Sequence, residues 1–239
     1  MKTIYLKIAL IFITLPLHAS IDIEQVWQVS TQEAIHATPL LNKKHIYLSS
    51  YDGNLYRVDK KKGKVLWNFE TENLISSTAV INQGTLFIGS GDGNMYAIYS
   101  KIGKEKWQHN TKDMITRRAI VVGEQVIFAS TDGYLYALNK QDGKQLWKHE
   151  LKSNISADLL YVDDTLYFTT IDHKIHAFDV KTQKSLWSYT LSERVSTQPI
   201  YKGGTLYLAD EKGEVVALNS KDGSEKWNFN APPQALLYP

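Results

Sequence analysis

The stretch TPLLNKKHIYLSSYDGNLYRVDKKKGKVLWNFE, residues 38–70, contains four short runs of apolar or alternating character. The runs cover residues 38–41, 45–50, 54–59 and 64–70, and turn-forming residues separate them. Asp52-Gly53 suits the positive φ values of a tight hairpin, and Gly63 follows Asp59 at the spacing of a type I turn closed by a left-handed residue. The stretch therefore predicts four short β-strands joined by antiparallel hairpins.

The same pattern recurs along the chain with a period of forty residues. The six tryptophans of the chain mark this period, and they are Trp27, Trp67, Trp107, Trp147, Trp187 and Trp227. No insertion or deletion interrupts the five full repeats, and no useful helical periodicity follows residue 20. Four strands per repeat with an aromatic signature are typical of a β-propeller blade. A β-solenoid is the alternative, and we disfavour it because its coils usually repeat at shorter periods without two tight hairpins.

The tryptophans are predicted to lie between adjacent blades. An indole in that position buries roughly 150–250 Å², which corresponds to about 4–6 kcal/mol of gross stabilisation. The prediction is an all-β propeller of four-stranded blades with about five complete blades and an extra strand around Trp27. Because the last repeat stops near Pro239, at the opening strand of a sixth blade, we expect an open or partner-completed ring. Five closed blades and a truncated copy of a longer propeller are the alternatives.

The repeat columns resemble those of a known family. DGYLYALNKQDGKQLW at residues 132–147 and DGNMYAIYSKIGKEKW at residues 92–107 are similar to the PQQ-like, or quinoprotein-type, propeller repeat with its tryptophan docking motif. That family includes quinone-dependent dehydrogenases and non-enzymatic exported propellers of the outer-membrane assembly factor (BamB) type. The resemblance implies that the dehydrogenases hold their quinone with adjacent cysteines, a calcium ion and a catalytic aspartate. This chain has no cysteine, so we expect neither a cofactor nor catalysis.

Residues 1–19 have the pattern of a secretory signal peptide, and residues 20–239 are predicted to form the propeller domain. The segment has a positive start, an apolar run from Ile8 to Leu17, and a small residue, Ala19, before the predicted cut. A retained membrane anchor is the alternative. Since Lys2 and Lys7 account for the net charge of +2, the remaining chain is neutral and lacks the basic surface typical of nucleic-acid binding. These features predict a periplasmic protein with no stable lipid anchor.

Two histidines and the repeated Asp-Gly pairs are the residues that could suggest a metal site. His173 and His176 replace a turn glycine and a strand tyrosine, and residues three apart on a strand point to opposite faces. The Asp-Gly pairs supply one carboxylate per turn, fewer than a calcium loop needs. His109 and His149 share a column with aromatic residues, so we expect them to pack as aromatic residues do. We predict no metal site and no catalytic residues.

Charged residues break the repeat at the start of the innermost strands. Arg117 and Arg118 replace small polar residues of the other copies, Asp158 does so one repeat later, and Glu193 and Arg194 come just before the next copy. These five residues are the predicted partner-binding group, with the arginines donating to carboxylate or carbonyl oxygens. Charges that only keep a solvated rim soluble are the alternative.

The sequence favours a non-catalytic scaffold for protein–protein interaction, which the resemblance connects with outer-membrane protein assembly. The expected partners are proteins, including envelope assembly components, and open blade edges would allow self-association. The alternatives are a quinone-binding redox protein and a truncated remnant of a quinoprotein dehydrogenase.

Overall fold

The computed structural model describes residues 25–230, and these residues form twenty β-strands in five four-stranded antiparallel sheets. The first sheet contains β1 (Leu40–Leu41), β2 (His45–Ser49), β3 (Asn54–Asp59) and β4 (Val65–Glu70). The second contains β5 (Val80–Asn82), β6 (Thr85–Gly89), β7 (Asn94–Tyr99) and β8 (Lys104–Asn110). The third contains β9 (Ile120–Val122), β10 (Gln125–Ser130), β11 (Tyr134–Asn139) and β12 (Gln145–Glu150). The fourth contains β13 (Leu160–Val162), β14 (Thr165–Thr170), β15 (Lys174–Asp179) and β16 (Lys184–Thr190). The fifth contains β17 (Ile200–Lys202), β18 (Thr205–Ala209), β19 (Glu214–Asn219) and β20 (Glu225–Asn230).

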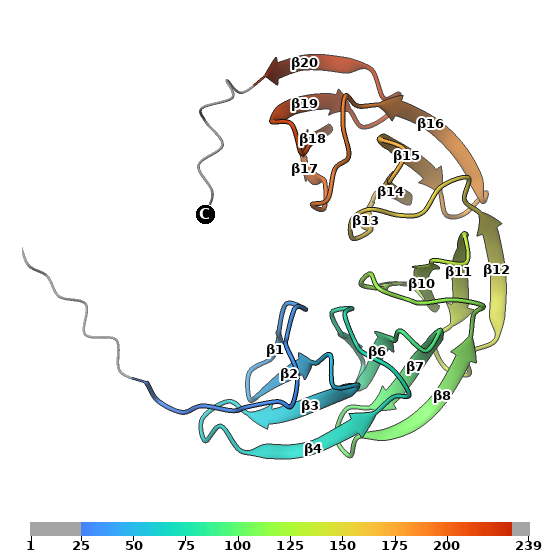
Figure 1. The fold of residues 1–239 in the computed structure, drawn as a ribbon. Coiled ribbons are helices and arrows are strands. Elements are labelled where there is room, and N and C mark those ends of the chain that lie inside the picture. Colours follow the sequence, from blue (N-terminus) through green and yellow to red (C-terminus); the bar gives the residue numbers. More distant parts are fainter. Residues whose placement is uncertain (1–24, 231–239) are drawn as a thin grey trace, which may run out of the picture.

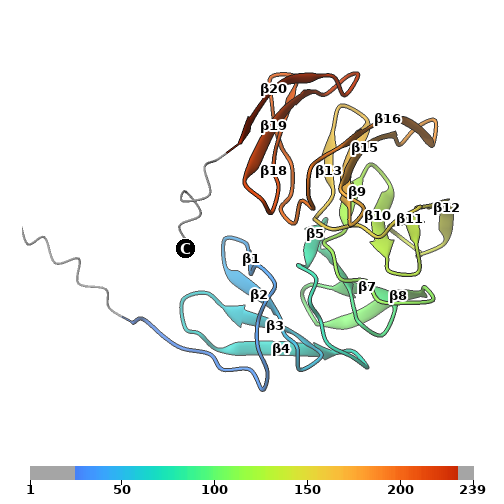
Figure 2. The same ribbon diagram turned by 45° about the horizontal axis from the view of Figure 1, so that its top comes forward.

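The sheets are arranged as the blades of a propeller. Within each sheet the strands pair in chain order, and the last strand of each blade lies on the outer rim (Figure 1). The blades form an arc that is open between the first and the fifth, and the first strands of the blades surround its centre (Figure 2). The predicted all-β, five-blade open propeller is thus confirmed. The predicted signal peptide at residues 1–19 lies outside the described residues.

The described part of the chain contains no helix that could cross a lipid bilayer. Both predicted turn types occur: the Asp-Gly hairpin of the first blade has Gly53 at a φ of 83°, and the next turn has Gly63 at a φ of 64°. Each blade also has one β-bulge at the same place between its third and fourth strands, as at Ala137/Leu138. The bulge sets the register in which the blade's tryptophan lies opposite the third strand, as Trp147 lies opposite Ala137.

Five of the six tryptophans contact the blade that follows them, as predicted, and Trp227 in the last blade is 46% exposed. The indole Nε1 of Trp107 donates a hydrogen bond to the carbonyl of Lys140 at 3.2 Å, and the ring covers Gly143. A Cβ atom at Gly143 would come within 2.7 Å of a ring carbon, so this turn has room only for glycine. The same pairing occurs at three other junctions, where the pairs are Trp27 with Gly63, Trp67 with Gly103 and Trp187 with Gly223.

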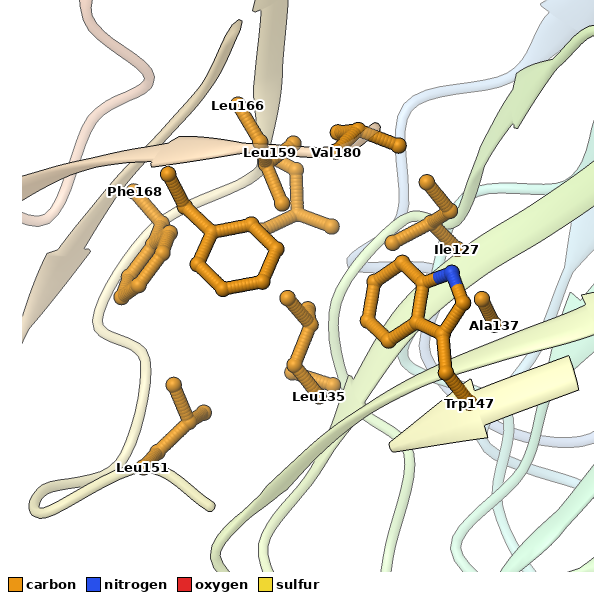
Figure 3. Close-up of a cluster of buried hydrophobic side chains, with 11 residues drawn as sticks. Ile127, Leu135, Ala137, Trp147, Leu151, Leu159, Leu166, Phe168 and Val180 are labelled. Atoms are coloured by element: carbon orange, nitrogen blue, oxygen red, sulfur yellow. The ribbon is translucent and has the colours of Figure 1, made fainter. Parts of the chain in front are cut away.

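The fourth tryptophan of the chain departs from this pattern. Gln183, at a φ of 56°, occupies the place of the docking glycine. The indole of Trp147 donates instead to the side-chain oxygen of Gln125 at 3.0 Å, within its own blade. The ring remains 8% exposed and packs between Ile127, Ala137 and Leu135 in the core between the third and fourth blades (Figure 3).

The segment around Trp27 differs in detail from the expected extra strand. Residues 25–36 have no strand assignment, although the carbonyl of Ala34 accepts a hydrogen bond from the backbone N–H of Tyr51 at 2.9 Å. Trp27 nevertheless contacts the first blade as the other tryptophans contact theirs, with Nε1 donating to the carbonyl of Lys60 at 2.9 Å. The contact between a tryptophan and the following blade therefore forms here without a β-strand around the tryptophan, whereas Trp67, Trp107 and Trp187 lie in the fourth strands of their blades.

Candidate functional site

The residues that begin the innermost strands meet at the centre of the arc. We call five of them the axial group, each one repeat from the next: Thr38, Thr78, Arg118, Asp158 and Gln198. Each precedes the first strand of its blade by two residues, so the repeat presents all five at equivalent positions. Thr38, Thr78 and Gln198 line both of two central pockets, which places those three blades around one shared space.

Hydrogen bonds within the axial group connect the third, fourth and fifth blades. The backbone N–H of Arg118 donates to Oδ1 of Asp158 at 3.0 Å, and its Nε lies 3.8 Å from Oδ2 of the same carboxylate. The Nη2 atom of Arg118 also donates to Oε1 of Gln198 at 3.4 Å. The Gln198 amide in turn donates to the carbonyl of Leu159. Arg118 and Asp158 are therefore largely occupied by each other.

Arg117, in contrast, has unused hydrogen-bonding capacity. Within residues 25–230 its buried Nε atom has no hydrogen-bond partner, and the same holds for the hydroxyl of Ser76. Both residues line a polar pocket of about 180 Å³, together with Asp158 and Thr116. Since an unsatisfied buried donor costs about 1–3 kcal/mol, a rotation of the guanidinium that brings this N–H to an oxygen acceptor in the pocket would be favourable.

A wider pocket, of about 610 Å³, shares residues with this polar pocket. Aliphatic side chains of the innermost strands line it, among them Leu40, Ile81 and Ile120. The centre of the arc thus combines a polar region, where Arg117 lies, with an apolar region along the inner strands. Such a combination suits an extended peptide that has apolar side chains and at least one oxygen acceptor.

Glu193 and Arg194 belong to a separate group between the fourth and fifth blades, and neither lines the central pockets. Arg194 donates from Nε and Nη2 to Oε1 of Glu211, at 2.9 and 2.7 Å. Glu193 contacts Lys212 and lies 3.5 Å from Nε2 of His173. The hydrogen bond from Lys212 lowers the pKa of the Glu193 carboxyl, and the charges of Lys212 and His173 add to this effect.

The structure therefore brings together Arg117, Arg118 and Asp158 and separates Glu193 and Arg194 from them. The sequence analysis did not identify Glu211 and Lys212, which in the fifth blade occupy the columns of Tyr51 and Asp52, while Gly213 keeps the turn glycine. Sequence reasoning also left out Ser76 and Gln198 as site residues. The positions equivalent to Ser76 and Gln198 hold polar residues in all five repeats, and this pattern could have identified them as site residues.

The histidines behave as the repeat columns indicate. His109 lies edge-on to Tyr136 with ring centroids 6.0 Å apart, and His149 lies 4.7 Å from Phe178, so both pack as aromatic residues. His173 faces Glu193, whereas Nε2 of His176 lies 3.1 Å from the hydroxyl of Thr170. The two histidines thus have different surroundings.

The residues at the axis do not fit the quinone and metal centre known from enzymes of this fold. Within residues 25–230 no group of three or more His, Cys, Asp and Glu side chains is placed to hold a metal ion. The carboxylate of the axial group, Asp158, already interacts with Arg118.

Comparison with known proteins gives one family and several similar structures. The profile of the outer membrane protein assembly factor BamB family matches residues 21–131 and 131–237. BamB from Moraxella catarrhalis is 17% identical with a TM-score of 0.75, and the match covers 85% of this chain and 66% of that one. Quinohemoprotein alcohol dehydrogenase ADHIIG from Pseudomonas putida HK5 is 15% identical with a TM-score of 0.74, covering 87% of this chain and 43% of that one.

A europium-containing methanol dehydrogenase is 16% identical with a TM-score of 0.74, covering 87% of this chain and 53% of that one. At these identities the structural matches show the fold alone. The chain spans less than two thirds of the length of these structures. No curated protein matches the sequence.

Proposed function

The chain belongs to the PQQ-like β-propeller family described by the BamB profile, and from this premise we propose that it is a non-catalytic scaffold that binds protein partners in outer-membrane protein assembly. The proposal places the protein in the periplasm, after export by the segment at residues 1–19. Its partners are envelope proteins, and it uses no cofactor. The Arg117 side chain, with its buried and unpartnered Nε, is the single observation that carries the proposal.

A partner segment would lie along the innermost strands. Its apolar side chains would contact the aliphatic wall of the wider pocket, and a carbonyl or carboxylate oxygen would accept the hydrogen bond from Arg117. Arg118 and Asp158 would then act as positioning residues, because their mutual contacts fix the edge of the polar pocket. Glu193 and Arg194 would hold the fifth blade in place through Lys212 and Glu211.

The test compares strains that carry the wild-type gene, a deletion, or a single variant. We expect the deletion to lower the amount of folded barrel protein in the outer membrane, the wild-type gene to restore it, and Arg117→Glu to fail. Lys144→Glu is the matched control, because the Lys144 side chain is 83% exposed and lies in the third blade away from the axis. Unchanged barrel levels in the deletion strain would refute the assembly role. Full rescue by Arg117→Glu would refute the role of Arg117.

A spectroscopic titration tests the redox alternative directly. Purified protein is mixed with pyrroloquinoline quinone and calcium, and the quinone absorbance is followed together with dye reduction by alcohols or sugars. We expect a flat titration, because the described residues offer no metal-binding group at the axis. Saturable uptake of the quinone with dye reduction would contradict the non-catalytic role.

A further inference from the structure

The junctions between the first three blades are filled by pairs of aromatic side chains. The ring of Tyr96 lies 5.3 Å from that of Phe69 of the preceding blade, and Tyr136 lies 6.0 Å from His109 in the same way. Each tyrosine hydroxyl also donates to the aspartate of its own hairpin, at 2.8 Å for Tyr96 and 2.6 Å for Tyr136. Both tyrosines are 5% exposed, so these junctions are closed.

The junction between the third and fourth blades departs from this arrangement. His176 takes the place of the tyrosine, and its shorter ring stacks on Phe168 with centroids 5.0 Å apart. His149, the counterpart of His109, leans on Phe178. A pocket of about 470 Å³ lies between the two blades, which we call the interblade pocket. The residues that matter for its chemistry are His149, Leu151, Phe168, Asp172, Lys174 and His176.

The interblade pocket is polar but close to neutral. Its lining contains two lysines, Lys152 and Lys174, and two carboxylates, Glu150 and Asp172, so the formal charges balance, and Lys174 donates to Asp172 at 2.8 Å. Burial lowers the pKa of both histidines below the ordinary value of 6.5, which favours the neutral imidazole, and Nε2 of His176 already lies 3.1 Å from the Thr170 hydroxyl. The pocket has no unpaired net charge with which to attract an ion.

An apolar wall lies beside these polar groups. Leu151 and Phe168 belong to the hydrophobic cluster of this junction, and Figure 3 shows both on the side of the cluster away from Trp147. Both residues also line the interblade pocket, together with Leu186. A bound molecule would therefore meet aliphatic and aromatic carbon on one side and a mixture of donors and acceptors on the other.

We propose that the interblade pocket binds an uncharged sugar unit. A hydroxyl group both donates and accepts hydrogen bonds, which matches the neutral imidazole of His149, Nδ1 of His176 and the Lys174–Asp172 pair. The C–H face of a sugar ring would lie against Phe168 and Leu151. A volume of about 470 Å³ suits one or two rings, since small-molecule pockets are typically about 300–1,000 Å³. This site is independent of the axial group and of the proposed partner binding.

The decisive variant is His176→Tyr, which restores the residue of the neighbouring repeats. Phe128 and Tyr136 already stack in the third blade with centroids 5.4 Å apart, so a tyrosine fits beside Phe168 in the same geometry. Its hydroxyl would then reach towards Asp172, as that of Tyr136 reaches Asp132. The variant should close the interblade pocket while the protein stays folded.

Binding is measured by ligand-detected NMR and by the imidazole signals of His149 and His176. The probes are glucose, galactose, N-acetylglucosamine and cellobiose at about 20 mM, well above a weak Kd near 1 mM, with glucuronate as the charged comparison. We expect at least one neutral sugar to shift the imidazole signals of the wild-type protein. The shifts should persist in His36→Tyr, an exposed position that precedes the first blade and does not line the interblade pocket, and binding should weaken at least tenfold in His176→Tyr.

Several outcomes would overturn the proposal. The first is that no neutral sugar changes the imidazole signals, and the second is that glucuronate alone binds. The third is that the folded His176→Tyr variant binds the sugar as strongly as the wild-type protein. None of them bears on the barrel-protein assay of the Arg117 variants, so the two proposals fail independently.

Discussion

Replacing Trp107 and Trp227 with alanine compares a tryptophan that contacts the next blade with one that does not. Trp107 is 8% exposed and donates to the Lys140 carbonyl, whereas Trp227, at the same position in the fifth blade, is 46% exposed. With about 250 Å² for a full indole side chain, the difference in exposure is about 100 Å², or about 2.5 kcal/mol. The lost hydrogen bond adds about 1 kcal/mol. Trp107→Ala should therefore cost about 3–4 kcal/mol more than Trp227→Ala.

The assay is urea unfolding followed by far-ultraviolet circular dichroism, because tryptophan fluorescence would itself change in both variants. Free energies of unfolding come from linear extrapolation, and similar slopes in all three proteins would show that the same cooperative unit unfolds. If the two variants lost the same free energy to within about 1 kcal/mol, burial between blades would not be the source of the stability at Trp107.

Three further predictions concern single contacts. Gly143→Ala should lower the free energy of unfolding in urea by about 1–3 kcal/mol more than Gly123→Ala does. Both glycines have positive φ, but only a methyl group at residue 143 would collide with an indole. Equal losses would contradict the close contact between Gly143 and Trp107. Tyr136→Phe should lower the free energy of unfolding by about 1.5–3 kcal/mol, because it removes the hydrogen bond from the Tyr136 hydroxyl to Asp132. Tyr134→Phe, whose hydroxyl has no such bond among the described residues, should lower it much less in the same assay. Burial raises the pKa of Asp172, but hydrogen bonds from Lys174, Thr170 and Ser153 outweigh it and lower the pKa to about 2. Stability from this carboxylate is therefore present above its ordinary pKa of 3.8 and is lost as the pH falls towards 2, so Asp172→Asn should reduce the loss of Tm over that acid range.

The contacts that recur at fixed offsets could be predicted from the sequence. A tryptophan every forty residues predicted indoles between adjacent blades, and the structure places four of them on a turn glycine, at Gly63, Gly103, Gly143 and Gly223. The prediction succeeds because each repeat has the same backbone, so one docking geometry applies to all copies. The exception at Gln183 was visible in the sequence as a break in the glycine column.

Contacts between side chains of different blades were less predictable. The sequence grouped Arg194 with Arg117, but Glu211 lies close enough to take both guanidinium hydrogen bonds of Arg194. The change of acceptor for Trp147, from a backbone carbonyl to Gln125, was not foreseen either. Such outcomes depend on which neighbour a long side chain reaches, and the forty-residue period carries no information about that choice.

Two of the residues that break the repeat, His176 and Gln183, lie in the fourth blade, where they lower the stability of the junction with the third blade. His176 lacks the hydrogen bond that a tyrosine at this position makes to the hairpin aspartate, and its Nε2 contacts Thr170 instead. Gln183 holds a left-handed conformation that glycine would adopt without strain. In a chain whose stability is roughly a sum over neighbouring blades, one weak junction is tolerated when the others are well packed. His176→Tyr should therefore raise the free energy of unfolding while it closes the interblade pocket. A variant that lost both binding and stability would show instead that His176 is part of an ordinary packed junction.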